Sequence, residues 1–168
     1  LKKPSIGVRY ISNMDKENIT IEKIYASAVE NHKKNNFKIA EELYRTILKL
    51  YPNYAGVHYN LGIMYSELEE YQKATNCYKK AIEINPNYLE AHNNLGLIFE
   101  KLDKLDKAVN CFQKAINIKP DYADAHNNLG LTLKKQKNYQ KAASCYEKAI
   151  QINPNHASAL SNLGIVFK

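Results

Sequence analysis

The sequence predicts an all-α fold, a stack of similar helical hairpins, and two regularities lead to this prediction. Prolines recur every 34 residues, at Pro52, Pro86, Pro120 and Pro154. Glycines recur at the same interval, at Gly62, Gly96, Gly130 and Gly164. A repeat of this length has room for two helices and a turn, and such units bury their apolar sides by stacking on one another.

The period sets the organisation of the chain when the proline is counted as position 32 of each unit. Complete repeats then cover 21–54, 55–88, 89–122 and 123–156, and a half repeat covers 157–168. Residues 1–20 carry no repeat signature and are expected to form an irregular lead-in segment. Because the chain starts at Leu1 and stops inside a repeat, we expect it to be a piece of a longer polypeptide.

Each repeat carries two sets of packing positions, one for each helix. Positions 4, 7, 8 and 11 share one face of a first helix, and positions 20, 24 and 27 share one face of a second. Position 20 is small in every unit, with Ala40, Ala74, Ala108 and Ala142. Position 24 carries a large ring, with Tyr44, Tyr78, Phe112 and Tyr146. We expect these two faces to meet, with the glycine at position 8 allowing a close approach of the helices.

The helix boundaries follow from these faces and from the proline. First helices are predicted near 21–34, 55–68, 89–102, 123–136 and 157–168, and second helices near 37–50, 71–84, 105–118 and 139–152. Proline cannot continue the second helix, and the polar residue after it is expected to cap the next first helix. These expected caps are Asn53, Asn87, Asp121 and Asn155.

This pattern resembles the tetratricopeptide repeat, with His58, His92 and His126 where that family usually has tryptophan. The resemblance covers about residues 21–168. It implies a right-handed superhelical solenoid of antiparallel helix-turn-helix repeats, whose first helices line a concave groove. It also implies a protein–protein interaction module, with no catalytic residue and no cofactor in this chain.

The groove should be lined by positions that the hairpin packing does not need. The candidate peptide-binding residues are Asn60, Asn94, Asn128 and Asn162 at position 6, Tyr59, Asn93 and Asn127 at position 5, and Ile63, Leu97 and Leu131 at position 9. An asparagine amide offers donors and an acceptor together, which matches a peptide backbone without demanding a side-chain sequence. Two alternatives stay open: the asparagines bond within or between hairpins, and the aliphatic residues pack between neighbouring first helices.

The cysteines and the histidines repeat with the same period, and this argues against a chemical site. Cys77, Cys111 and Cys145 all occupy position 23, one unit apart, which is too far for a disulfide. Unpaired cysteines fit a reducing compartment, so a cytoplasmic or nuclear location is expected. The histidines at position 4 are also one unit apart and cannot share one metal ion, so we expect packing residues and no metal site.

Composition narrows the class of partner. The net charge is +7, but the only arginines are Arg9 and Arg45, and scattered lysine is typical of a solvated helix face rather than of a nucleic-acid surface. No apolar run is long enough to span a bilayer. We therefore expect a protein or peptide ligand, no nucleic acid and no membrane.

A narrower resemblance concerns runs such as AHNNLGLIFEKLDKLDKAVNCFQKAINIKPDYADAHNNLG. They are similar to the repeats that precede the catalytic region of the nucleocytoplasmic protein O-glycosyltransferases, the O-linked N-acetylglucosamine transferases and the SPINDLY-type enzymes. In that family a ladder of asparagines at position 6 holds substrate polypeptide, and this role carries over to Asn60, Asn94, Asn128 and Asn162. Ala26 breaks the ladder in the first repeat, and the aliphatic position 9 is closer to SPINDLY. The resemblance implies the substrate-recognition region of such an enzyme, whose sugar-nucleotide domain is not in this chain.

The alternative is a free-standing scaffold or a co-chaperone adaptor with no attached enzyme. Co-chaperone adaptors hold an acidic C-terminus with a clamp of basic residues. In that family the clamp has cations at position 5 of one unit and at positions 2 and 6 of the unit two repeats later. Starting from the unit at 55, these positions hold Tyr59, Asp124 and Asn128. The charge complementarity that the adaptor needs is therefore missing.

Overall fold

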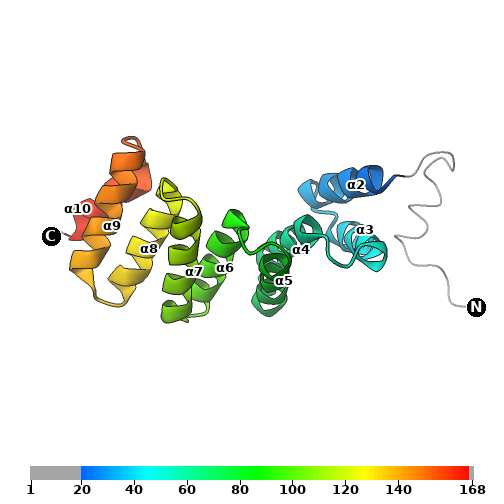
Figure 1. Cartoon of the computed structure of the whole chain (residues 1–168), viewed down its shortest axis with the longest axis horizontal. Helices are drawn as coiled ribbons and strands as arrows, with labels where there is room; N and C mark the ends of the chain where they lie inside the picture. The colour runs from blue at the N-terminus through cyan, green and yellow to red at the C-terminus, as the bar shows by residue number, and fades with distance from the viewer. Residues whose placement is uncertain (1–19, 167–168) are drawn as a thin grey trace, which may run out of the picture. The chain divides into compact units, whose positions relative to one another are not determined.

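The computed structural model describes residues 20–166, and within that range it contains helices and turns but no strand (Figure 1). The helices fall into two compact units, 20–85 and 86–166. The first unit contains α2 (Ile21–Lys33), α3 (Phe37–Leu50), α4 (Ala55–Glu67) and α5 (Tyr71–Ile84). The second unit contains α6 (Leu89–Lys101), α7 (Leu105–Ile118), α8 (Ala123–Lys135), α9 (Tyr139–Ile152) and α10 (Ala157–Val166). The all-α fold class is confirmed, and the predictions for residues 1–19 and 167–168 lie outside the described residues.

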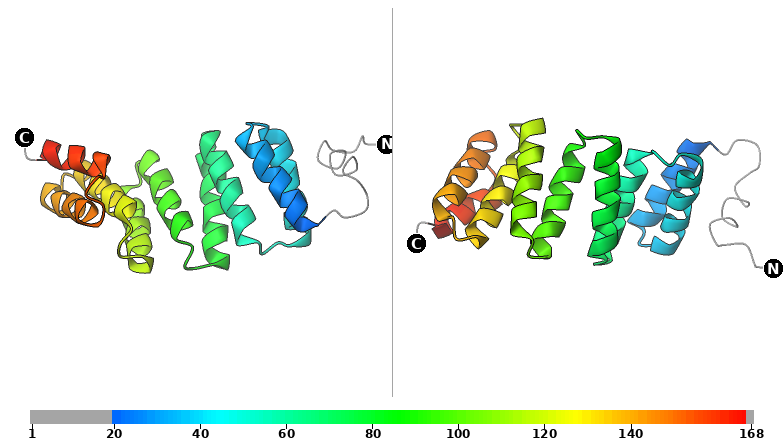
Figure 2. Two further views of the ribbon diagram at one scale, coloured as in Figure 1. Left: turned by 90° about the horizontal axis from the view of Figure 1, so that it is seen from above. Right: turned by 60° about the horizontal axis from the view of Figure 1, so that its bottom comes forward.

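Within each unit, successive helices form antiparallel hairpins that stack side by side (Figure 2). In the first unit α2 pairs with α3 and α4 with α5, and in the second α6 pairs with α7 and α8 with α9. The first helices of neighbouring repeats also touch, α2 with α4 in one unit and α8 with both α6 and α10 in the other. We call the surface formed by positions 2, 5, 6 and 9 of these first helices the ladder face.

In the second, third and fourth repeats, the contact that closes the hairpin joins a glycine at position 8 to a ring at position 24. In the first repeat position 8 is Ala28. A Cβ atom added to Gly96 would lie 2.6 Å from Cε1 of Phe112, and one added to Gly130 would lie 2.6 Å from Cε1 of Tyr146. Phe112 and Tyr146 are fully buried. The predicted hairpin interface is therefore confirmed, and the rings fill the space that the absent glycine side chains leave.

The turn inside each hairpin depends on a residue in the left-handed conformation. The four residues are Asn35, Glu69, Asp103 and Lys137, with φ between 55° and 61°. In each turn the following N–H donates to a carbonyl five residues back, as Asn138 does to Leu133 at 2.9 Å. Lys137 N–H donates to the carbonyl of Lys134 at 2.9 Å, which completes a Schellman motif. None of the four is glycine, so the usual sequence signal for this conformation is missing.

The predicted caps of the first helices are wrong by one residue. The residues that precede α4, α6 and α8 are Tyr54, Tyr88 and Tyr122, and none of these makes a side-chain capping hydrogen bond. The physical reason is the turn after the proline, in which Tyr122 N–H donates to the carbonyl of Lys119 at 3.1 Å. Asp121, the expected cap, lies inside this turn, so the helix begins one residue later than a cap at Asp121 would require. The histidine at position 4 stabilises the same loop from inside the helix, because its Nε2 contacts the proline carbonyl oxygen.

Replacing Gly96 by alanine should lower the free energy of unfolding by about 1 to 3 kcal/mol, because the new Cβ overpacks the buried ring of Phe112. Urea denaturation measures this. The matched control is Gly164→Ala in α10, where an added Cβ meets no atom within 4 Å. That variant should be neutral or gain up to about 1 kcal/mol from helix propensity. Equal losses at the two positions would show that the interface is misplaced.

Replacing Lys137 by glycine should raise the free energy of unfolding by about 0.5 to 1 kcal/mol. Glycine adopts positive φ without the cost of about 1 to 2 kcal/mol that a Cβ imposes, and this gain exceeds its larger loss of chain entropy. Thermal and urea denaturation both report it. Lys137→Ala keeps the Cβ and should give no gain, so equal stabilisation by the two variants would assign the effect to the lost lysine charge instead.

Candidate functional site

The ladder face carries a chain of hydrogen bonds between side-chain amides. In the second unit, Asn128 Nδ2 donates to Asn93 Oδ1 and Asn162 Nδ2 donates to Asn127 Oδ1, both at 3.1 Å. In the first unit, Asn60 Nδ2 donates to the hydroxyl of Tyr25 at 2.8 Å. Each position-6 asparagine in these three bonds therefore reaches position 5 of the preceding repeat, 35 residues earlier.

Contacts between asparagines that are adjacent in the sequence complete the chain of amides in the second unit. Asn127 Nδ2 lies 3.5 Å from Asn128 Oδ1, and Asn93 Nδ2 lies 3.4 Å from Asn94 Oδ1. Asn93 and Asn127 are only 5 % exposed. They lie behind the position-6 asparagines and hold them in place, which is one of the two alternatives left open by the sequence.

The position-6 asparagines keep hydrogen-bonding capacity after these contacts. Asn60, Asn94, Asn128 and Asn162 are all half-buried, so part of each side chain reaches the surface. An amide nitrogen carries two hydrogens and its oxygen two lone pairs. Asn128 commits one hydrogen to Asn93 and one lone pair to Asn127, which leaves one donor and one acceptor for a ligand.

The apolar candidates at position 9 are also half-buried. Ile63, Leu97 and Leu131 each expose part of their surface between the polar positions. Tyr59, at position 5 of the second repeat, is half-buried and packs on the ring of Tyr78 with centroids 5.9 Å apart. These residues combine packing with exposure, so they form aliphatic and aromatic strips beside the amides.

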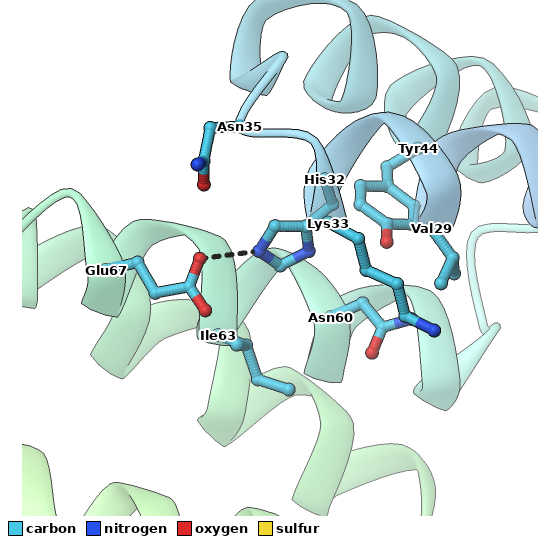
Figure 3. Close-up of a pocket in the computed structure, with 8 residues that line it drawn as sticks. All are labelled: Val29, His32, Lys33, Asn35, Tyr44, Asn60, Ile63 and Glu67. Carbon is cyan, nitrogen blue, oxygen red and sulfur yellow. Dashed lines mark hydrogen bonds and ion pairs between the residues drawn. The ribbon is translucent and has the colours of Figure 1, made fainter.

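Each unit has a hollow on the ladder face. In the second unit the hollow lies between α8 and α10, has a volume of about 620 Å³, and is lined by uncharged side chains that include Asn128, Leu131, Ser158 and Asn162. In the first unit a cavity of about 340 Å³ lies between α2 and α4 and includes Asn60 and Ile63 in its lining (Figure 3). Side chains from positions 6 and 9 therefore line a hollow of the surface in each unit.

Side-chain contacts at positions 12 and 13 join neighbouring first helices beside the ladder face. His32 Nε2 lies 2.9 Å from Glu67 Oε2 in the first unit, and Lys135 Nζ lies 2.6 Å from Glu100 Oε1 in the second. The acidic residue is at position 13 in the first contact and at position 12 in the second. Sequence reasoning missed both pairs and also missed Tyr25, although all of these contacts share a separation of 35 residues that would have identified them.

The histidines and cysteines serve structure. Nε2 of His58, His92 and His126 lies 2.8 to 2.9 Å from the carbonyl oxygen of the proline six residues earlier. The three cysteines are free, and burial raises the pKa of the Cys77 thiol to about 11. A thiol with so high a pKa is almost entirely protonated at neutral pH and is a poor nucleophile.

Residues 20–166 lack the features of two further classes of site, a metal centre and a membrane-spanning helix. No group of three or more His, Cys, Asp or Glu side chains there could hold a metal ion. No helix in this range is long and apolar enough to cross a membrane.

Comparison with protein families agrees with the geometry. A tetratricopeptide repeat model matches residues 55–88 and 123–156, which are the bounds that the period sets for the second and fourth repeats. Further tetratricopeptide models match residues 77–110 and 101–137, so the matches together span more than half of the chain without a gap. The chain belongs to the tetratricopeptide repeat family. A comparison with curated proteins gave no significant match.

Solved structures with the same fold are numerous, and three illustrate their range. The crystal structure of the MamA protein is 27% identical, with a TM-score of 0.81, and the match covers 88% of this chain and 80% of that one. The structure of pilF from Pseudomonas aeruginosa is 20% identical, with a TM-score of 0.79, over 88% of this chain and 67% of that one. The first tetratricopeptide domain of Spaghetti, bound to the HSP90 peptide SRMEEVD, is 22% identical, with a TM-score of 0.66, over 67% of this chain and 90% of that one.

These findings define the coarse function. Tetratricopeptide arrays present extended surfaces that bind other proteins, and this chain is such an array.

Replacing Asn128 by alanine should lower the free energy of unfolding by about 1 to 3 kcal/mol, since Asn93 Oδ1 would lose its donor while buried. This exceeds what a solvated amide would cost, so the ladder contributes to folding. Urea denaturation measures the loss. Ser161→Ala, an exposed change on the same face, should stay within about 0.5 kcal/mol of the original chain. An Asn128→Ala loss as small as the Ser161→Ala loss would remove the structural role.

Proposed function

We propose that the array binds an extended polypeptide along the ladder face of its first helices. The observation that carries this proposal is the state of the position-6 asparagines. Asn60, Asn128 and Asn162 are fixed in place by hydrogen bonds to the preceding repeat, and Asn128 retains one donor and one acceptor at the surface of an uncharged hollow. A peptide unit offers one N–H and one C=O, so a fixed amide can satisfy both.

Fixing the amides before the ligand arrives also favours binding. Ordering a free side chain costs about 0.5 to 1.5 kcal/mol at an interface, and an asparagine already hydrogen-bonded to its neighbour avoids most of that cost. The aliphatic strip at Ile63, Leu97 and Leu131 adds apolar contact for side chains of the ligand.

We further propose that the polypeptide is a substrate presented to a protein O-glycosyltransferase of the O-linked N-acetylglucosamine transferase or SPINDLY type. The support is the resemblance of the repeats, in which position 6 is asparagine and position 9 is aliphatic. The three solved structures compared above, MamA, pilF and Spaghetti, are not described as glycosyltransferases, so they add no support to this part of the proposal. A cytoplasmic or nuclear location is part of the same proposal and rests on the free cysteines.

The co-chaperone alternative has one observation in its favour, because the Spaghetti domain was solved with an HSP90 peptide. That peptide ends in acidic residues, and the cations that would hold an acidic C-terminus are absent from Tyr59, Asp124 and Asn128. We therefore favour a ligand recognised through its main chain.

The test is a selection of linear peptides from a random library on the whole chain, followed by titration of the selected peptides by fluorescence anisotropy. Asn128→Ala should weaken binding about fivefold to tenfold, the equivalent of one lost hydrogen bond of roughly 1 kcal/mol. The matched control is Asn110→Ala, the same chemical change at an exposed position of α7. It should leave affinity unchanged.

Both variants must remain folded at the temperature of the titration, which circular dichroism checks. A photo-crosslinking residue at position 131 should capture the selected peptides, and one at position 110 should not. Equal effects of the two alanine variants, or crosslinking from position 110 alone, would move the binding surface to the second helices.

A further inference from the structure

The cavity in the first unit is continuous with the ladder face but has a different chemistry (Figure 3). Its volume is about 340 Å³, which suits one side chain rather than a length of backbone. Val29 and Ile63 supply apolar walls, and Asn60 supplies the ladder amide. A polypeptide lying along the ladder face would pass over its mouth.

The most unusual group in the lining is the hydroxyl of Tyr44. Tyr44 is 0 % exposed, and its hydroxyl makes no hydrogen bond of ordinary length and angle. Burial raises the pKa of this hydroxyl and outweighs a looser polar contact with the Asn60 amide, which lowers it, so the hydroxyl keeps its proton and remains a donor at neutral pH. A buried polar group without a partner is rare in native proteins and calls for a physical explanation.

Packing does not explain the hydroxyl. Phe112 occupies the same position of the third repeat and is buried equally well without one. The tyrosine oxygen is therefore dispensable for the hairpin contact. Its place in the lining, between α2 and α4, suggests that it meets a ligand atom.

The charges around the cavity decide what kind of ligand atom fits. Lys33 and Glu67 both line the cavity. Glu67 Oε2 also lies 2.9 Å from Nε2 of His32. The opposite charges of Lys33 and Glu67 offset each other, so neither a carboxylate nor an ammonium ligand would gain a net electrostatic attraction. A neutral group that both donates and accepts hydrogen bonds would satisfy both residues and also accept from Tyr44.

We propose that this cavity is a specificity pocket for the carboxamide of an asparagine or glutamine side chain in the bound polypeptide. The proposal rests on the function proposed above. The carboxamide oxygen accepts from the Tyr44 hydroxyl and Lys33, and the carboxamide nitrogen donates to Glu67. The stem of the ligand side chain lies between Val29 and Ile63.

Propionamide, propionate and propylammonium are the probes, because they share one carbon stem and differ in the polar end. Each is titrated into the whole ¹⁵N-labelled chain at matched ionic strength and followed by nuclear magnetic resonance. Propionamide should shift the side-chain amide of Asn60 and the backbone amides around Lys33 and Glu67, and it should bind more tightly than the two ions. Stronger shifts with either ion, or propionamide shifts confined to other helices, would overturn the proposal.

Three variants sharpen the test. Tyr44→Phe should fold normally, as Phe112 does, and should weaken propionamide binding about fivefold to tenfold through the loss of one hydrogen bond. Tyr146→Phe deletes another buried hydroxyl without a partner, in the second unit, and should leave propionamide binding unchanged. Glu67→Gln should bind propionate more tightly than the original chain, because only the cation remains beside the pocket. Unchanged propionamide binding by Tyr44→Phe would overturn the proposal.

The outcomes for the pocket and for the groove are separable. The effect of Asn128→Ala on selected peptides is measured in the second unit, which does not contain this pocket. A failure of propionamide binding with intact dependence on Asn128 would remove the pocket alone. The converse result would remove main-chain recognition by the ladder.

Discussion

The contact between a missing side chain and a ring is the constraint on which the hairpins of the second, third and fourth repeats depend. Gly62, Gly96 and Gly130 each leave a space that the ring at position 24 of the same repeat fills. This contact sets how closely the two helices approach, and so fixes the depth at which all other residues of the repeat lie. The ladder asparagines sit two residues before these glycines, on an adjacent part of the same helix, so their height above the hairpin core is set by the same contact.

A second class of contact determines how neighbouring hairpins of a unit are aligned. Bonds between residues 35 apart join Asn60 to Tyr25, Asn128 to Asn93 and Asn162 to Asn127. The contacts of His32 with Glu67 and of Lys135 with Glu100 have the same separation. Because the repeat itself is 34 residues long, each bond connects a position to the one after it in the next repeat. The asparagines that we propose to contact a polypeptide are therefore also among the side chains that align the repeats.

The sequence predicted the helices well because the information is local. Residues three and four apart define a helix face, and a proline every 34 residues defines where it ends, so the second helices at 37–50, 71–84, 105–118 and 139–152 have the predicted bounds. The pairing of glycine with a ring could be predicted for the same reason, since both fall at fixed positions of one repeat.

Other features depend on geometry that the period does not contain. The left-handed residues at Glu69 and Lys137 carry no glycine signal, because the Schellman hydrogen bonds impose the conformation on whatever residue is present. The role of Asn93 and Asn127 behind the ladder depends on the alignment of one repeat against the next, which a repeating pattern leaves undetermined. The unpaired hydroxyl of Tyr44 was invisible for a similar reason, since its ring alone accounts for the motif.

The amide chain of the second unit has a direction. It runs from Asn162 through Asn127, Asn128 and Asn93 to Asn94, and at each step the side-chain nitrogen of one asparagine donates to the side-chain oxygen of the next. Amide groups linked in one sense polarise each other, so a hydrogen bond made at one member strengthens the donors and acceptors of the next. In the binding mode that we propose, a peptide group held by one repeat would change the affinity of the next repeat for the following group. The repeats of this unit would then bind cooperatively through the polarisation of their linked amides, with no movement of the backbone.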